Sequence, residues 1–241
     1  MQFESIACRV LIGLISWLWL LPGLAAELSR QDVILTIAKA GIHQPQLVKK
    51  DLSGLDLSGI DFNKANLFSA NLDGAKLDAA RLNGTNLNLA QIRHASLRKA
   101  NLSGASLYGV VLDNSDLSGA DLSDSRVTGS LNNVNLTGAK LRRANLGPNT
   151  EIQGQASDRV EMTNAVLNHA DLREVNFTHA VMTNVSLRNV DLSGGQFGWA
   201  DLSGANLIGA NLSGADFRNA NLDGAKLDNL RGQDTSVGIR N

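Results

Sequence analysis

A five-residue period in the positions of large apolar residues is the dominant feature of this 241-residue chain. From Leu52 to Leu227 an apolar residue recurs at almost every fifth position, in the order Ala-Asn/Asp-Leu-Ser-Gly. This period matches neither the turn of an α-helix, at about 3.6 residues, nor the two-residue alternation of a long β-strand. It predicts a solenoid, in which each unit is stable only when it stacks against its neighbours.

Each repeat has the composition of a short strand followed by a corner. In Ala100-Asn101-Leu102 a small apolar, a polar and a large apolar residue alternate as they do in a strand. Ser103-Gly104 then form a turn, because glycine accepts a positive φ and serine bonds to nearby backbone. We therefore expect a coil whose centre leucines and preceding alanines face inward and form a continuous core.

The spacing of unusual core residues predicts four sides in each turn of the coil. Phe177, Phe197 and Phe217 are separated by twenty residues, and so are Met162 and Met182. Like residues lie above one another only if four five-residue sides complete a turn, which favours a square coil over a triangular one. With turns about 4.8 Å apart, about nine of them form a rod on the order of 43 Å long.

These repeats resemble those of the pentapeptide-repeat proteins, whose motif is Ala-Asp/Asn-Leu followed by two variable residues. The motif occurs here in Ala65-Asn66-Leu67, Ala100-Asn101-Leu102 and Ala205-Asn206-Leu207, among many other places. The resemblance implies an all-β fold, a right-handed quadrilateral β-helix, over most of the chain. It implies no catalytic residue, because the family motif contains none.

The period changes phase at two places. One residue is missing near Gly129, most economically at a corner, and one extra residue lies between Gly147 and Arg159. The segment from Gly147 to Arg159 is polar and contains a proline, which predicts a loop or a poorly formed side of the coil. We therefore expect the β-helix over residues 50–230, with a break at 147–160.

The front end of the β-helix is a strand edge and needs a cover. Residues 27–49 are expected to form a helical cap that begins at Ser29 and stops at Gly41. Asp32 is placed for a capping box, and Leu28 with Val33 for a hydrophobic staple. The residues expected to cover the first coil are Val33, Ile34, Ile37 and Ala38, together with Ile42, Leu47 and Val48.

The back end leaves two possibilities open. The polar tail at 231–241 is too short to predict a second helix. Either Leu230, Val237 and Ile239 fold over the last coil, which gives a monomer, or the strand edges pair with a second copy in a C-terminal, two-fold homodimer.

Residues 1–26 have the composition of a secretory signal peptide. The apolar stretch Val10 to Leu24 follows Arg9 and precedes the small residues Ala25-Ala26. It is shorter than the about 20 residues that cross a bilayer. We predict cleavage and export to a periplasm or thylakoid lumen, with no membrane contact afterwards; the alternative is an uncleaved membrane anchor.

Composition points away from several kinds of chemistry. The only cysteine, Cys8, lies in the leader, so the remaining chain has no thiol or disulfide. Loss of Glu4 and Arg9 with the leader changes 22 basic and 23 acidic residues to 21 and 22, a balance that creates no net field for nucleic acid. The four histidines form no metal-binding pattern, and no nucleophile elbow or phosphate loop is present. We expect no enzyme activity, no metal and no cofactor.

Apolar residues at outward positions are the candidate contacts for a protein partner. A strict twenty-residue count places Phe68, Tyr108 and Ile208 on one side of the coil, with Leu89 beside them. The same count places Trp199 on another side, one turn from His179. Chance exposure is the alternative, because single apolar residues are common on protein surfaces.

Three functions remain open on the sequence alone. We prefer an exported, non-catalytic structural or protein-interaction module that presents flat β-helix faces to an unknown partner, as the resemblance to members with leaders in cyanobacteria and thylakoid lumens implies. The second is a DNA-mimicking modulator of DNA gyrase, which the leader and the neutral charge disfavour. The third is an enzyme, for which the sequence offers no set of nucleophile, base and orienting group.

Overall fold

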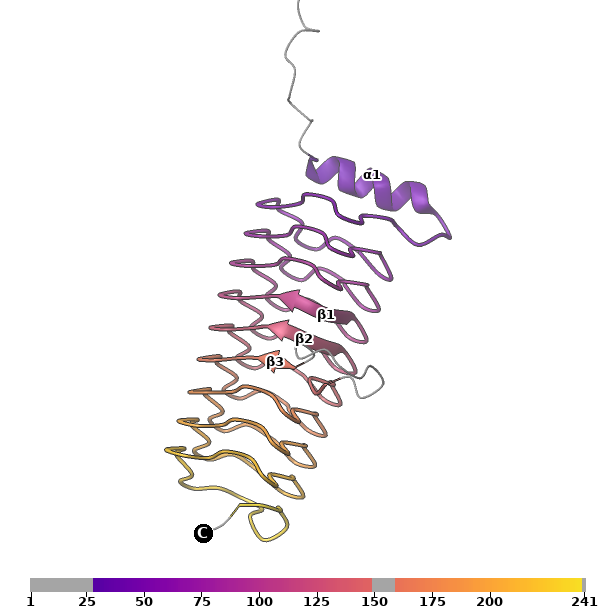
Figure 1. Ribbon diagram of the computed structural model, residues 1–241. Helices are drawn as coiled ribbons and strands as arrows, with labels where there is room; N and C mark the ends of the chain where they lie inside the picture. The colour runs from indigo at the N-terminus through magenta and orange to yellow at the C-terminus, as the bar shows by residue number, and fades with distance from the viewer. Residues whose placement is uncertain (1–27, 149–158, 240–241) are drawn as a thin grey trace, which may run out of the picture.

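The chain winds into a rod of stacked coils, with one helix lying over the first coil (Figure 1). The computed structural model describes residues 28–148 and 159–239. The expected leader at 1–26 lies outside these residues, as does most of the expected break at 147–160.

Parallel pairing between residues twenty positions apart defines four sides, as the sequence predicts. Each side is named here by the residue at which its pairing begins: side A at Gln46, side B at Asp51, side C at Asp56 and side D at Asp61. At most places a side contributes one paired residue, which is shorter than the strand expected for each repeat. The corner after every fifth residue leaves no room for a longer ladder.

Three longer strands occur in the middle of the rod. They are β1 (Ser106–Val111), β2 (Arg126–Ser130) and β3 (Val160–Glu161). They pair in parallel in the order β1-β2-β3 (Figure 1). Strands β1 and β2 cross the corner between sides A and B, and β3 lies on side B. These strands lie where the five-residue period changes phase.

The core is a stack of leucines and alanines with aromatic rings near the C-terminal end. Leu102 and Ala100, like most residues at equivalent positions, are completely buried. The rings of Phe177 and Phe197 are 5.5 Å apart between centroids, and those of Phe197 and Phe217 are 4.7 Å apart. The prediction that these three rings stack on one inner face is confirmed.

The missing residue near Gly129 is confirmed at the corner between sides A and B. Leu107 pairs with Val127, but Val110 pairs with Gly129, so this corner is one residue short. Thr128 replaces the main-chain acceptor that the short corner lacks. Its buried Oγ1 accepts a hydrogen bond of 3.0 Å from the Gly109 N–H. At complete corners a main-chain carbonyl accepts this bond.

The break shifts the numbering of the sides. Arg126 pairs with Asn145 and Asn145 pairs with Asn176, so two turns of side A cover 50 residues instead of 40. Every residue after the break is therefore displaced by ten positions, which equals two sides of the rod. A strict twenty-residue count is therefore correct within the residues before the break and within those after it. It places a residue after the break on the opposite side of the rod from its true one.

Helix α1 (Arg30–Ala40) covers the first coil and begins with the expected capping box. The Ser29 side chain accepts from the Asp32 N–H, and the Asp32 carboxylate accepts from the Ser29 N–H at 2.9 Å. The Ser29 hydroxyl also donates to the Asp32 carboxylate at 2.6 Å, and this bond, together with that from the Ser29 N–H, lowers the pKa of the Asp32 carboxyl. Val33 is completely buried beneath the helix, and Leu28 packs against the same core.

Two residues expected in this cap do not cover the coil. Ala38 is exposed because it lies about 140° around the helix from the buried Val33. Ile42 is 98% exposed because Gly41 ends the helix and turns the chain away from the core. The prediction was wrong for both, whereas Leu47 is buried and Ile34, Ile37 and Val48 are partly buried.

Arg30 covers part of the free strand edge, a role that the sequence pattern does not reveal. Its guanidinium donates to the carbonyl oxygens of Asp56 at 2.5 Å and Ser58 at 2.9 Å. In the next coil the equivalent carbonyl of Lys76 accepts from the Leu57 N–H. The arginine therefore replaces hydrogen bonds that a preceding coil would make.

We expect Arg30→Ala to loosen the cap and to lower the free energy of unfolding by about 1 kcal/mol, since two acceptors lose their donor. Hydrogen exchange should then quicken at the Leu52 and Leu57 amides of the first coil. Gln31→Ala is the matched control, because Gln31 is exposed on the same helix and its side chain makes no hydrogen bond to a residue that the structure describes. Equal exchange rates in the two variants would contradict this role of Arg30.

The last coil ends on side A. Val237 is its final paired residue, and its carbonyl accepts from the Phe217 N–H at 2.7 Å. Leu230 and Ile239 are partly buried against the core, while the centre residues Leu222 and Leu227 are less buried than those of earlier coils. The choice between monomer and C-terminal homodimer stays a prediction.

Candidate partner-binding surface

The pairing of the coils changes the expected grouping of the contact residues. Phe68 and Tyr108 lie on side A, on either side of Asn88. Ile208 lies on side C, where its carbonyl accepts from the Asn189 N–H. Its predicted place beside Phe68 and Tyr108 was wrong because the break displaces later residues by two sides. Ile208 is therefore on the opposite side of the rod.

The structure also changes the side to which Trp199 is assigned, and it places this residue near side A instead of away from it. It lies at the corner between sides A and B, in the same column as Leu89 and His179. The ring centroids of His179 and Trp199 are 6.2 Å apart and the ring planes differ by 8°. The prediction of neighbouring turns for this pair is confirmed, but the prediction that Trp199 lies on another side than Leu89 was wrong.

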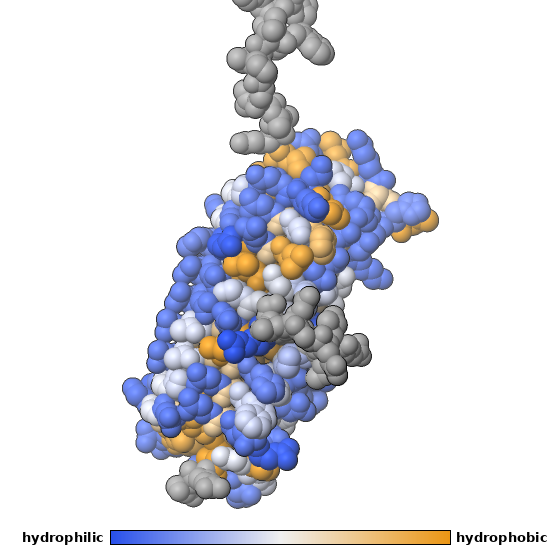
Figure 2. Space-filling model, viewed as in Figure 1, coloured by the Kyte–Doolittle hydropathy of each residue, from blue (hydrophilic) through white to orange (hydrophobic). Residues whose placement is uncertain are grey.

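Side A and its corner thus carry four of the five candidate residues, with Phe68, Leu89 and Tyr108 on neighbouring coils and Trp199 five turns beyond Leu89. Leu89 is 46% exposed and Trp199 62% exposed, while Phe68 and Tyr108 are partly buried. Hydrophobic areas interrupt the mostly hydrophilic surface near the middle of the rod, on the face that carries β1 (Figure 2). We call Phe68, Leu89 and Tyr108 the aromatic patch.

Side A also carries the fewest charges among the described outward strand positions. Those charges belong to Arg126, Asp216 and Arg218. Asp216 and Arg218 pair with each other at 2.6 Å. On side B, in contrast, the acidic residues at such positions are Asp51, Asp73, Asp113, Glu161, Asp201 and Asp223. Side A therefore presents a nearly neutral surface.

Arg126 lies on side A one turn below the strand that carries Tyr108. Its Nη2 atom is buried and has no hydrogen-bond partner within the part of the chain that the structure describes. A buried donor without an acceptor costs about 1 to 3 kcal/mol.

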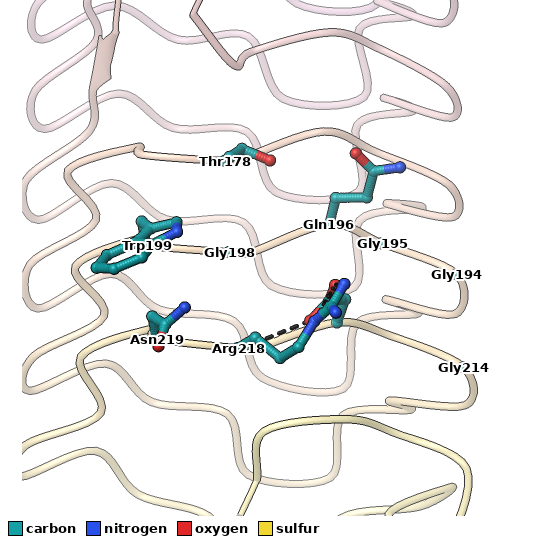
Figure 3. Close-up of a pocket in the computed structure, with 10 residues that line it drawn as sticks. Thr178, Gly194, Gly195, Gln196, Gly198, Trp199, Gly214, Arg218 and Asn219 are labelled. Carbon is teal, nitrogen blue, oxygen red and sulfur yellow. Dashed lines mark hydrogen bonds and ion pairs between the residues drawn. The ribbon is translucent and has the colours of Figure 1, made fainter.

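A second feature of side A is a depression of 600 Å³ beside Trp199. Trp199 stands at one edge, Gln196 and Arg218 at the other, and Gly198 between them (Figure 3). Hydrogen bonds from the side chain and the backbone N–H of Arg218 lower the pKa of the Asp216 carboxyl. The depression is polar on one edge and aromatic on the other.

The amide side chains near Trp199 depart from the pattern of the rest of side A. Elsewhere these amides form ladders, as where Asn86 donates to Asn66 at 3.1 Å and Asn176 donates to Asn145 at 3.0 Å. Gln196 occupies the next position of that ladder, yet its side chain makes no hydrogen bond to any described residue (Figure 3). Asn219, beneath Trp199 in Figure 3, makes none either.

Other kinds of site are not assembled in the described ranges. These ranges contain no group of three or more metal-ligating side chains. They also contain no helix with the length and apolarity to cross a bilayer. Sequence reasoning missed Arg126, whose buried Nη2 atom is visible only in the packed structure. It also missed the free amide of Gln196, which only the pairing across the break places on side A.

Comparison with known proteins places the repeats in a family. The model of the family described as pentapeptide repeats matches eight copies, over residues 51–84, 85–126, 159–194 and 196–229. A search among curated proteins found no match.

Several solved structures are similar to this chain. HetL, a pentapeptide repeat protein involved in heterocyst differentiation regulation in the cyanobacterium Nostoc sp. strain PCC 7120, is 32% identical, with 80% of this chain and 82% of that chain covered and a TM-score of 0.44. QnrB1, a plasmid-mediated fluoroquinolone resistance protein, is 20% identical in a trypsin-treated form, with coverage of 72% and 87% and a TM-score of 0.37. A pentapeptide repeat protein of the Arabidopsis thaliana thylakoid lumen is 24% identical, with coverage of 68% and 66% and a TM-score of 0.23.

The matched repeats cover more than half of the sequence, and HetL, which is 32% identical, is covered over 82% of its length. The chain therefore belongs to the pentapeptide repeat family, whose fold is a right-handed β-helix.

Proposed function

We propose that this protein is an exported, non-catalytic interaction module whose side A binds a protein partner. The observation that carries the proposal is the meeting of Phe68, Leu89 and Tyr108 on the least charged side of the rod. Exposed aromatic and large apolar residues surrounded by neutral polar groups are typical of the centres of protein interfaces.

The rod holds this patch in a rigid form. The Tyr108 N–H donates to the Asn88 side chain at 2.8 Å, and the Leu89 N–H donates to the Tyr108 carbonyl at 2.8 Å. Each contact residue is thus fixed to the coil above or below it. A preorganised surface loses little conformational entropy when it binds, so few anchors suffice for affinity.

Arg126 supplies the chemical specificity of this surface. Arg126 is partly exposed, and it is the only charge on side A without an ionic partner among the described outward strand positions. The partner that fits is a flat, neutral protein surface with one carboxylate or carbonyl oxygen opposite Arg126.

Binding should depend on the aromatic patch and not on Ile208. We expect Phe68→Ser combined with Tyr108→Ser to weaken partner binding at least about 30-fold, the equivalent of two anchors worth about 1 kcal/mol each. The measurement is the affinity of partners cross-linked to and co-purified with the wild type. Ile208→Ser is the matched control, because Ile208 is a partly buried apolar residue at the same repeat position on the opposite side. A partner that binds all variants equally would contradict the assignment of side A.

Export rests on the composition of residues 1–26, and it has its own test. Fractionation followed by N-terminal sequencing should recover a mature chain that begins near Glu27 outside the cytoplasm. An intact Met1 in the cytoplasm would overturn export. Modulation of DNA gyrase would then be the function to test, by direct binding to the topoisomerase.

A further inference from the structure

We infer that the depression beside Trp199 binds a neutral sugar residue. This site is separate from the aromatic patch of Phe68, Leu89 and Tyr108, although both lie along side A. The volume of 600 Å³ lies within the range of about 300 to 1,000 Å³ that is usual for small-molecule sites.

Most glycines of the depression are required by the backbone or by a neighbouring side chain, but one is not. Gly194 and Gly214 have φ of +69° and +67° at corners, and Gly195 leaves space for the ring of Phe197. Gly198 has neither reason: a Cβ there would meet nothing closer than the Arg218 carbonyl oxygen at 3.7 Å. The equivalent position one turn earlier carries Thr178. The effect of glycine at 198 is to leave the space beside Trp199 open.

Trp199 provides a surface for the C–H groups of a sugar ring. It is the most exposed aromatic residue in the described chain, and one face of its ring is turned toward His179, which leaves the other face for a ligand. The face of an aromatic ring is electronegative and attracts the weakly positive C–H hydrogens of a pyranose. A rigid ring loses little entropy when such a ligand binds.

The polar edge provides partners for hydroxyl groups. The amides of Gln196 and Asn219 each offer both a donor and an acceptor, and neither is used within the described chain. Asp216 and Arg218 cancel each other in charge at 2.6 Å. Free amides, a neutralised ion pair and an aromatic ring together suit an uncharged polyol and disfavour phosphates and carboxylates.

Tryptophan fluorescence can report on this site alone. The chain has three tryptophans, and Trp17 and Trp19 both lie in the first 26 residues. In the full chain carrying Trp17→Phe and Trp19→Phe, Trp199 is the only source of the signal. The probes are chitotetraose, cellotetraose and maltotetraose, with a proline-rich decapeptide as the competing ligand class. We expect a saturable change with at least one oligosaccharide.

Two substitutions test the geometry without removing the reporter. Gly198→Thr copies the residue of the preceding turn and should weaken sugar binding at least tenfold, with the circular dichroism spectrum and melting temperature unchanged. Gln196→Asn copies Asn176 and should weaken binding by shortening the reach of the free amide. Ile208→Ser, on the opposite side, should leave sugar binding unchanged.

The inference is overturned if none of the three oligosaccharides gives a saturable signal, if only the peptide does, or if Gly198→Thr binds sugar as well as the parent. These results are independent of the proposed function, because Phe68→Ser with Tyr108→Ser should weaken partner binding at least about 30-fold and keep sugar binding. Loss of both activities in that variant would instead mean that the two sites are one surface.

Discussion

Leu102→Asp is expected to destabilise the rod by on the order of 4 kcal/mol, because it places an unpaired carboxylate in a completely buried position. The Leu102 N–H donates to the Asp121 carbonyl at 2.6 Å, so the backbone cannot carry the new charge outward without losing the ladder. The measurement is the melting temperature, with hydrogen exchange to locate the opened coils.

The control is the neighbouring substitution Ser103→Asp. Ser103 is partly exposed at a corner, and its N–H already donates to the Asn101 side chain at 3.0 Å. The new carboxylate remains in water, so a change of less than about 0.5 kcal/mol is expected. Equal melting temperatures for the two variants would show that the inward assignment of Leu102 is wrong.

Gly129→Ala is expected to cost at least about 3 kcal/mol and to disturb the junction of β1, β2 and β3. Gly129 has φ of +111°, and an added Cβ would collide with the backbone of Val110. That backbone is fixed by pairing in the sheet, so it cannot move aside cheaply. Denaturant unfolding and hydrogen exchange at β1 and β2 measure the effect.

Gly104→Ala separates this collision from the general cost of a positive φ. Gly104 has φ of +63° at a complete corner, and an added Cβ would meet no atom within 4 Å. Non-glycine residues such as Ala79 and Lys99 occupy the equivalent corner conformation, so a loss of only about 1 kcal/mol is expected. If both glycine variants were equally stable, the shortened corner would not depend on Gly129.

The sequence predicts most of the fold because one local rule is repeated along the chain. The spacing of Phe177, Phe197 and Phe217 predicts four sides, and the stacked rings confirm it. Ser29 and Asp32 predict the start of the cap, since a capping box uses only residues close in sequence. The missing residue near Gly129 is also visible in the sequence as a change of phase.

The side assignments after the break could not be predicted by counting. They depend on how many residues leave the coil, and spacing alone does not distinguish a loop from a distorted side. Ile208 and Trp199 therefore exchanged places relative to the expectation. Arg30 and Arg126 were missed for a related reason, because the edge carbonyls and the buried Nη2 atom are products of three-dimensional packing.

The direction in which an outward side chain points depends on the number of residues in the coils before it, and this affects how such a rod can evolve. Inward leucines are nearly interchangeable between coils, whereas each outward residue points in a direction set by the number of repeats before it. Inserting one five-residue repeat upstream of Trp199 would turn that residue and everything after it by a quarter of a revolution, with the interior preserved. Inserting or deleting repeats could thus change which side of the rod carries a given outward residue, without the substitution of any side chain.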